Sequence, residues 1–207
     1  MSLFNSNLPF LVLIRFQHND AAAYHNSVIR QKPLLRTIFE ALPLLTISRL
    51  ELIEEIGKKS EFTIPRQRYG LGIIAFPSIG KIRDWLEMSY EVRQKEWLFP
   101  VDIVIVPSRW RIKSIDENTI VEILEIVKYR SPSRFSSECL DKIDSAKENN
   151  IVAVPRYATE VLRGSWNPLY IIINVWSSDT EYNSNSHFAL NDISDLVVGY
   201  SYIGHCY

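Results

Sequence analysis

The chain has 207 residues, of which 46% are hydrophobic, 12% aromatic and 23% charged, and these values exclude a disordered chain. Lys and Arg together number 23 and Asp and Glu 24, so a formal net charge of −1 gives no general attraction to nucleic acid or to an anionic membrane surface. Only 7 glycines are present, which argues against a glycine-rich loop that cradles phosphate.

Two cysteines, Cys139 and Cys206, are too few for a disulfide framework or a cysteine-rich metal site, and we expect both to be free thiols. The segment Met1–Pro9 has no basic leader, and the apolar run after it is interrupted by Arg15, so no signal peptide is predicted. No stretch approaches the roughly 20 apolar residues that a membrane span needs. We therefore expect a cytoplasmic protein with no membrane association.

The first half of the chain predicts six elements in the order strand, helix, strand, strand, helix, strand. Runs rich in branched residues indicate the strands, and apolar residues at helical spacing indicate the second helix. Pro33 is expected to kink or divide the first helix. One long strand is expected after it, although its Glu-Leu-Ile-Glu-Glu stretch also fits a helix. The six elements are Leu8–Gln17, Ala21–Phe39, Leu44–Ile56, Tyr69–Phe76, Ile79–Leu98 and Val101–Val106.

The second half of the chain predicts the same order of elements. Ser131-Pro132 opens its first helix, with proline at a position that suits a helix start. The second helix is weaker, because its segment is polar and helical only near its end. The six elements are Ile120–Tyr129, Ser131–Asn149, Ile151–Leu162, Leu169–Trp176, Asp179–Leu196 and Val197–His205.

Short matches between the halves indicate an internal repeat. Arg49 matches Arg156 and Gly57 matches Gly164, at a separation of 107 in both cases (156 − 49 and 164 − 57). Phe76 matches Trp176 at a separation of 100 (176 − 76), and the longer loop at 58–68 accounts for the change. Chance similarity between two αβ segments is the alternative. The order βαββαβ in both halves predicts an α+β protein of two tandem ferredoxin-like repeats, residues 1–110 and 111–207.

Strands in both halves are apolar on both sides, as in Leu11–Ile14 and Ile171–Ile173, which is typical of sheets covered on both faces. Two such sheets in one chain can cover each other. We therefore predict a pseudo-dimeric α/β barrel with helices outside and alternate strand residues inside. A fused pseudo-dimer needs no second chain to complete its barrel, so a monomer is expected.

Residues 69–107 resemble the domain-of-unknown-function 1330 family. The resemblance is carried by Phe76-Pro77-Ser78, Trp85, Ser89-Tyr90 and the Val101–Val106 strand, although this segment lacks a proline that the family has between Ser and Glu-Tyr. It implies a dimeric α/β barrel and brings no established catalytic residues. Relatives on this fold include cofactor-free monooxygenases, small-molecule isomerases and haem enzymes, and fold analogy does not choose between them.

Standard catalytic and cofactor motifs are absent from the sequence. Gly70-Leu-Gly72 is a fragment of a dinucleotide fingerprint and precedes a strand, which is the wrong context. The four histidines are scattered, so neither a metal site nor haem bound through His187 or His205 is favoured over surface or hydrogen-bonded histidines. We expect no metal and no bound cofactor.

Charged residues within apolar strand patterns are the most informative candidates. Arg15, Arg49 and Arg156 occur in such patterns, and so do Glu51, Glu122 and Glu125. A buried arginine must be paired or must face a wet cavity. The functional interpretation is that Arg49 and Arg156, which are equivalent in the repeat, hold an anionic ligand. The structural interpretation, which the sequence favours, is a solvated strand face or an ion pair with a glutamate.

Aromatic residues complete the predicted site. Tyr24 and Trp176 are expected near the ligand, with His25 as the best general base because an unperturbed histidine titrates near neutral pH. For Trp85 and Trp97 the helical spacing favours an ordinary core role. The predicted site therefore has His25 as its catalytic residue and Arg49, Arg156, Tyr24 and Trp176 as its ligand-binding residues.

The leading functional hypothesis is binding, and conversion without a cofactor, of a small organic molecule between the two sheets. The alternative is a non-enzymatic structural or protein-interaction module whose barrel interior is filled by side chains. An RNA-binding sheet is disfavoured, since the chain has neither the Lys/Arg-Gly-Phe type of sheet motif nor a net positive charge.

Overall fold

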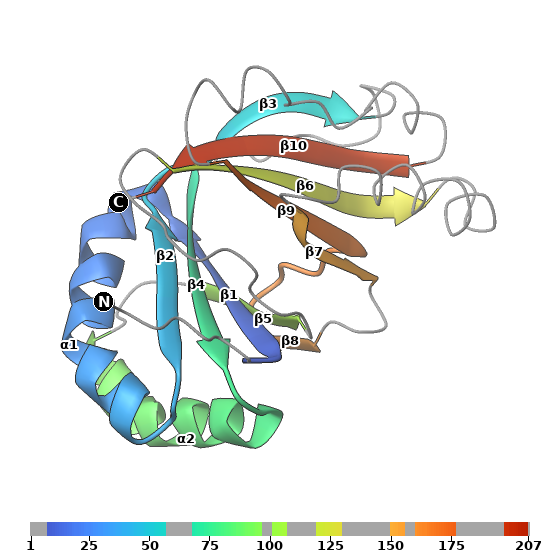
Figure 1. The fold of residues 1–207 in the computed structure, drawn as a ribbon. Helices are drawn as coiled ribbons and strands as arrows, with labels where there is room; N and C mark the ends of the chain where they lie inside the picture. Colours follow the sequence, from blue (N-terminus) through green and yellow to red (C-terminus); the bar gives the residue numbers. More distant parts are fainter. Residues whose placement is uncertain are drawn as a thin grey trace.

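The computed structural model describes residues 8–56, 68–96, 101–106, 119–129, 150–155, 160–176 and 197–206. These residues form two five-stranded sheets that pack face to face, with two helices on the outer face of the first sheet (Figure 1). The helices expected at 131–149 and 179–196 lie outside the described residues.

The first sheet has the strand order β2-β4-β1-β5-β8, and all neighbouring strands are antiparallel. Four of its strands come from the first half of the chain and the edge strand β8 comes from the second half. The strands are β1 (Phe10–Gln17), β2 (Leu42–Ile47), β4 (Tyr69–Phe76), β5 (Val101–Val106) and β8 (Glu160–Arg163).

The second sheet has the order β3-β10-β6-β9-β7, again antiparallel throughout. Here four strands come from the second half of the chain and the edge strand β3 comes from the first. The strands are β3 (Glu51–Ile56), β6 (Ile120–Tyr129), β7 (Asn150–Pro155), β9 (Tyr170–Trp176) and β10 (Val197–His205).

Two strands that the sequence predicts as continuous are each divided between the sheets, and those predictions are wrong. Leu44–Ile56 forms β2 in the first sheet and β3 in the second, with a break at 48–50. Ile47 pairs with Leu71 of β4 and also makes an isolated bridge to Cys206, so the chain changes partner sheet there. Ile151–Leu162 likewise contributes β7 to the second sheet and β8 to the first.

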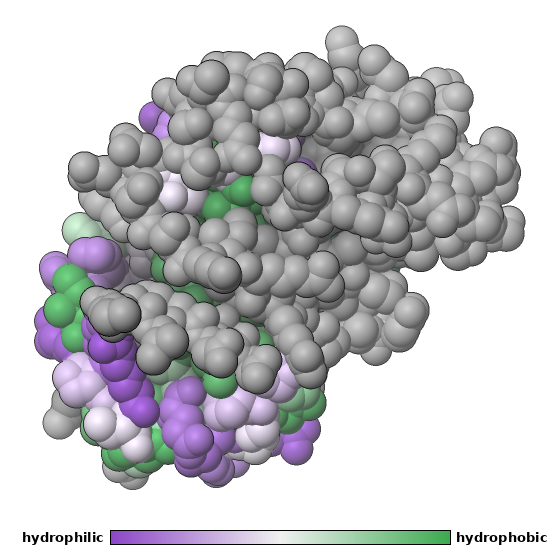
Figure 2. Space-filling view, viewed as in Figure 1, coloured by the Kyte–Doolittle hydropathy of each residue, from purple (hydrophilic) through white to green (hydrophobic). Residues whose placement is uncertain are grey.

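Helices α1 (Ala21–Thr37) and α2 (Ile79–Glu96) cover the outer face of the first sheet, and the short helix η1 (His18–Asp20) leads into α1. Pro33 was expected to kink or divide this helix, and it does not divide it, because α1 runs unbroken from Ala21 to Thr37. A proline in a helix removes one backbone donor, and the Pro33 side chain is exposed. The outer side of the helices mixes hydrophilic and hydrophobic side chains (Figure 2).

Strand alternation produces two hydrophobic layers, which explains why the strands are apolar on both sides. Along β1, Leu11 and Leu13 face the second sheet, and Val12, Ile14 and Phe16 face the helices. The layer between the sheets also contains apolar side chains from β2, β4, β5, β6 and β9. The helix-facing layer includes Trp85, which is 1% exposed, so its predicted core role is confirmed.

Candidate functional site

An ion pair interrupts the apolar layer between the sheets. Arg15 follows Leu11 and Leu13 on the inward face of β1 and lies beside its cross-strand neighbour Asp102 of β5. Its Nε and Nη2 donate to Asp102 Oδ2 at 3.0 and 2.8 Å. The two side chains are only 15% and 17% exposed, so the two charges are largely removed from water and are balanced by each other.

The loop between β8 and β9 completes the surroundings of Asp102. The backbone N–H groups of Ser165 and Trp166 donate to Asp102 Oδ1 at 2.8 and 3.3 Å. Gly164 precedes them with φ +84°, and a Cβ at that position would overlap Asp102 Oδ1. Glycine is therefore required here both for its backbone conformation and for the close approach to the carboxylate.

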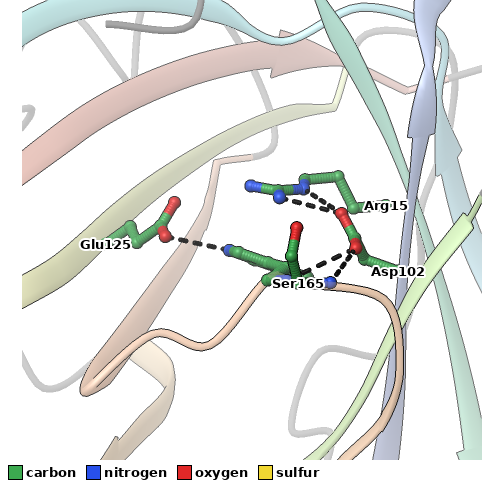
Figure 3. Close-up of polar contacts among 5 residues, drawn as sticks. Arg15, Asp102, Glu125 and Ser165 are labelled. Carbon is green, nitrogen blue, oxygen red and sulfur yellow. Dashed lines mark hydrogen bonds and ion pairs between the residues drawn. The ribbon is translucent and has the colours of Figure 1, made fainter. Parts of the chain in front are cut away.

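Trp166 connects this ion pair to the opposite sheet. Its indole Nε1–H donates to Glu125 Oε1 at 2.9 Å, and Glu125 lies on the inward face of β6. Glu125 is 7% exposed and Trp166 is 5% exposed. Figure 3 shows Arg15 and Asp102 on one side of the layer and Glu125 approaching from the other.

Aromatic rings surround the two charged groups. The Arg15 Cζ atom lies 4.3 Å from the centroid of the Tyr69 ring and 4.8 Å from that of Trp166, both within the range of a cation–π contact. On β10, Tyr200 is the cross-strand neighbour of Glu125, and the ring of Tyr202 packs against that of Tyr200. The polar cluster therefore has apolar walls, in which charge interactions are stronger than in water.

Burial is the main influence on the titration of this cluster. Burial raises the pKa of Glu125, Asp102 raises it further, and the positive charge of Arg15 and the hydrogen bond from Trp166 act against the rise. Burial also raises the pKa of the Tyr202 hydroxyl, and the nearby Glu125 carboxyl adds to that rise. A carboxyl group whose pKa is moved toward neutrality is suited to accept or donate a proton.

Two polar atoms of the cluster make none of the hydrogen bonds found among the described residues, and neither belongs to the fully buried polar atoms that lack a partner. They are Nη1 of Arg15, a donor, and Oε2 of Glu125, an acceptor that becomes a donor when protonated. Both belong to side chains between the sheets. Chemically, this arrangement can hold an oxygen-bearing molecule at Arg15 and exchange a proton with it at Glu125.

The predicted ligand-binding residues are not brought to one place. Tyr24 lies on α1, is 1% exposed, and stacks on Phe16 with ring centroids 4.3 Å apart in the helix-facing layer. Trp176 lies on β9 next to Val175, which faces the first sheet, so Trp176 points to the outer face of the second sheet. Both sheets therefore separate Tyr24 from Trp176.

The remaining predicted residues lie elsewhere. Arg49 is in the break between β2 and β3 and pairs with Glu51 Oε1 at 3.3 Å, with both side chains substantially exposed. This is the ion pair of the structural interpretation. His25 is half-buried on α1, on the helix side of the first sheet. Arg156 lies outside the described residues, and so does His187, while His205 is exposed at the end of β10.

Three members of the observed cluster carry a signal in the sequence, although none of them is among the predicted site residues. Arg15 and Glu125 were singled out as charged residues in apolar strands, and Asp102 has the same signature in Val-Asp-Ile-Val-Ile-Val. The preference for Arg49 and Arg156 rested on their equivalence in the repeat. Trp166 gives no local signal, because it lies in a segment that predicts only a turn.

Among the described residues, no group of three or more His, Cys, Asp or Glu side chains is placed to hold a metal ion. In the same part of the chain, neither helix combines the length and the apolar character that crossing a membrane requires.

The described residues form an α+β fold of two facing antiparallel sheets, and this fold fits the dimeric α/β-barrel type. Among solved structures, the chain is similar to an anthrone oxidase-like protein, with a TM-score of 0.53 and 11% identity over 97% of this chain and 92% of that one. It is also similar to a protein from Fusobacterium nucleatum subsp. nucleatum named "Putative monooxygenase", with a TM-score of 0.47 and 10% identity over 97% of each chain.

A third similar structure is a dye-decolorizing protein from V. cholerae, with a TM-score of 0.42 and 8% identity over 95% of this chain and 93% of that one. No family model matches the sequence, and no curated protein matches it. At 11% identity the likeness to the anthrone oxidase-like protein shows the fold alone.

Proposed function

We propose that the protein binds a small organic molecule between its two sheets, at the cluster of Arg15, Asp102, Trp166 and Glu125, and that Glu125 exchanges a proton with the bound molecule without a cofactor. The observation that carries this proposal is the presence of an open donor on Arg15 and an open oxygen on Glu125 in an otherwise apolar layer. Neither atom is among the fully buried polar atoms without a partner, so both keep some exposure and can be reached by a small molecule.

The anthrone oxidase-like protein supports the proposal to the extent that its name denotes a protein acting on a small organic molecule. The proposed chemistry for this chain comes from its own residues, because fold alone does not decide function. Binding by Arg49, Arg156, Tyr24 and Trp176, with His25 as base, stays a prediction. So does membership of residues 69–107 in the domain-of-unknown-function 1330 family.

We also propose that residues 1–110 and 111–207 are tandem ferredoxin-like repeats that form a pseudo-dimer within one chain. The support is the strand order, since β2-β4-β1-β5 of the first half corresponds to β7-β9-β6-β10 of the second. Each half also gives one strand to the sheet of the other. On this view the cluster is assembled from both halves, with Arg15 and Asp102 from the first and Trp166 and Glu125 from the second.

The alternative function, a structural or interaction module with a filled interior, is favoured by a different observation. Among the described residues, sixteen buried side chains form the apolar layer between the sheets, and this layer surrounds the polar cluster. On this alternative the Arg15–Asp102 pair and its link to Glu125 serve only to hold the two sheets together.

Native mass spectrometry of the protein purified from its own host separates the two functions, together with the Trp166 indole 15N–1H resonance measured before and after removal of bound molecules. We expect a small-molecule adduct on the 24.0 kDa chain and a shift of the Trp166 resonance when the molecule is removed. A bare chain with an unchanged resonance, also after addition of a library of small organic molecules, would favour the filled-interior module.

The Glu122→Gln variant is the control for changes at Glu125. Glu122 lies on the other face of the same strand, where it is hydrogen-bonded to Asn174.

A further inference from the structure

The class of ligand can be inferred from the balance of donors and acceptors at this site, and the inference rests on the function proposed above. Both oxygens of Asp102 are already occupied, Oδ2 by Arg15 and Oδ1 by the N–H groups of Ser165 and Trp166. The indole N–H of Trp166 is occupied by Glu125. Two atoms are therefore left to contact a ligand, and we call them the open edge of the site. Nη1 of Arg15 can only donate a hydrogen bond, whereas Oε2 of Glu125 accepts one when ionised and can donate one when protonated.

The charge state of Glu125 decides what this edge accepts. Its surroundings contain Arg15 on β1, Asp102 on β5, Tyr69 on β4, and Tyr200 and Tyr202 on β10. With Glu125 ionised, the charges of Arg15, Asp102 and Glu125 sum to one negative charge in a largely buried layer. With Glu125 protonated they sum to zero, and Oε2 can present a second donor beside Arg15.

We infer that the ligand of this site is an organic monoanion, such as a carboxylate, which is held by the open edge of the Arg15 guanidinium and is taken up together with one proton on Glu125. An anion and an ionised Glu125 would repel each other across a low-dielectric layer. A protonated Glu125 removes that repulsion and donates to the anion. The result is a neutral pair of Arg15 and Asp102 plus one anion that accepts hydrogen bonds from both sheets.

A cationic ligand is disfavoured by the same geometry. It would need an ionised Glu125 as its partner, and Arg15 acts on that same carboxyl from the facing sheet. The carboxylate of Asp102 cannot serve instead, because four N–H donors, two of them from the positively charged Arg15, already satisfy it. A positive ligand would therefore lie beside the open edge of a guanidinium, which can only donate hydrogen bonds.

The test is isothermal titration calorimetry of the full chain with four probes: benzoate and acetate as anions, and benzamide and acetamide as their neutral counterparts. Titrations run from about pH 6 to pH 9 in buffers of different ionisation enthalpy, so that proton uptake is measured directly. Both acids stay ionised in this range, since carboxyl groups titrate near pH 4 in water. The Trp166 indole resonance reports whether binding occurs at this site.

We expect at least one anion to bind at least tenfold more tightly than its amide. We also expect its Kd to rise by up to tenfold per pH unit where Glu125 ionises, with uptake approaching one proton per anion. In Glu125→Gln the Kd should lose this pH dependence, because the amide is neutral throughout and still donates. The matched control Glu122→Gln should keep the pH dependence of the natural chain.

Two arginine variants test the guanidinium edge. Arg15→Lys keeps a positive charge beside Asp102 but has no second guanidinium nitrogen to donate to the anion. The affinity of this variant for the anion should fall at least tenfold. Arg15→Met should lose binding, and circular dichroism would show whether it still folds. If Arg15→Met does not fold, the lysine variant still decides the point, since unchanged affinity in Arg15→Lys would overturn the inference.

The remaining outcomes separate the two levels of the proposal. Amides that bind as tightly as the anions, or anion binding without proton uptake anywhere in the range, would overturn the inference and leave small-molecule binding standing. A pH dependence that persists in Glu125→Gln would show that the proton is carried by the ligand instead. No binding of any probe, with no shift of the Trp166 resonance, would count against the proposed function itself.

Discussion

A carboxyl group that is buried opposite an arginine is subject to two opposing effects. For Glu125, loss of water favours the protonated form, while Arg15 and the Trp166 indole favour the ionised form, and loss of water is the larger effect. The folded chain therefore binds this proton more tightly than the unfolded chain does. Above the ordinary glutamate pKa of 4.5, the free energy of unfolding should fall as pH rises, until the folded-state pKa is passed.

Glu125→Gln should remove this part of the pH dependence. The difference in unfolding free energy between the variant and the natural chain should grow in favour of the variant by up to about 1.4 kcal/mol per pH unit in that window, and then level off. The glutamine oxygen can still accept from the Trp166 indole, so the hydrogen bond is retained. Urea denaturation at a series of pH values measures this difference, and a constant difference would contradict the expected titration.

The two glycines of β4 have a packing role that their sequence motif does not reveal. A Cβ at Gly72 would overlap the hydroxyl of Tyr24, and one at Gly70 would overlap the ring of Phe16. These two rings stack on each other against the sheet. The Gly-Leu-Gly sequence thus makes room for an aromatic pair under α1.

Gly72→Ala should therefore lower the free energy of unfolding by roughly 1–3 kcal/mol, the usual range for an overpacked core. Gly80→Ala is the matched control, because Gly80 lies on α2 and its nearest side-chain neighbour would be 3.7 Å from the new Cβ. That variant should change stability by no more than about 1 kcal/mol, in the stabilising direction. Chemical denaturation of both variants tests the comparison, and equal effects would show that the Tyr24 hydroxyl moves aside easily.

At the scale of elements, the loop between β8 and β9 joins the two sheets. Gly164 allows its backbone to donate to Asp102, and Trp166 carries the connection to Glu125. The N–H of Leu169 then donates to the carbonyl of Ile126, which fixes the other end of the loop to β6. Residues from both sheets therefore hold this short segment.

Gly164→Ala should disturb both connections at once. A left-handed conformation costs an alanine about 1–2 kcal/mol, and the new Cβ displaces the Asp102 carboxylate. We expect a loss of unfolding free energy of roughly 1–3 kcal/mol together with a shift of the Trp166 indole resonance. Ser165→Ala is the control, since it changes an exposed side chain and keeps the backbone donor. A destabilised Gly164→Ala with an unchanged resonance would show that the loop does not position Trp166.

Prediction from sequence succeeded for elements whose pattern is local. The strands Tyr69–Phe76 and Val101–Val106 match their expected bounds, because an apolar run between turn residues suffices to define them. Leu44–Ile56 was not predictable in the same way, since its residues suit a strand throughout. The break depends on Ile47 meeting partners from both sheets, and those partners are distant in sequence.

The candidate site was predictable only in part, for a related reason. Strand patterns showed that Arg15 and Glu125 are charged residues in apolar surroundings, but only the packing of the two sheets brings them together. The repeat drew attention to Arg49, which lies at a turn and pairs with an exposed glutamate. Similarity between halves identifies equivalent positions, and equivalence by itself does not place a residue inside the barrel.

At the scale of the whole molecule, the exchange of β3 and β8 between the sheets means that neither half completes its own sheet. We expect the natural chain to be a monomer of 24.0 kDa in light scattering over a wide range of concentration, because both sheets are already paired within one chain. Fragments 1–110 and 111–207, expressed separately, should be unstable alone and should associate when mixed. An obligate dimer of the full chain, or a stably folded single fragment, would contradict the tandem arrangement.

The register of the two sheets has one more consequence. Arg15 lies between Leu71 and Asp102 in the first sheet, and Glu125 lies between Ile171 and Tyr200 in the second, so the two residues occupy matching positions in the proposed repeat. Two identical subunits related by a twofold axis would present the same side chain twice, and two facing arginines or two facing glutamates would repel each other. A single chain is free of that restriction. Duplication followed by divergence would let one barrel place a base opposite an acid, which a symmetric ancestor could not do at these positions.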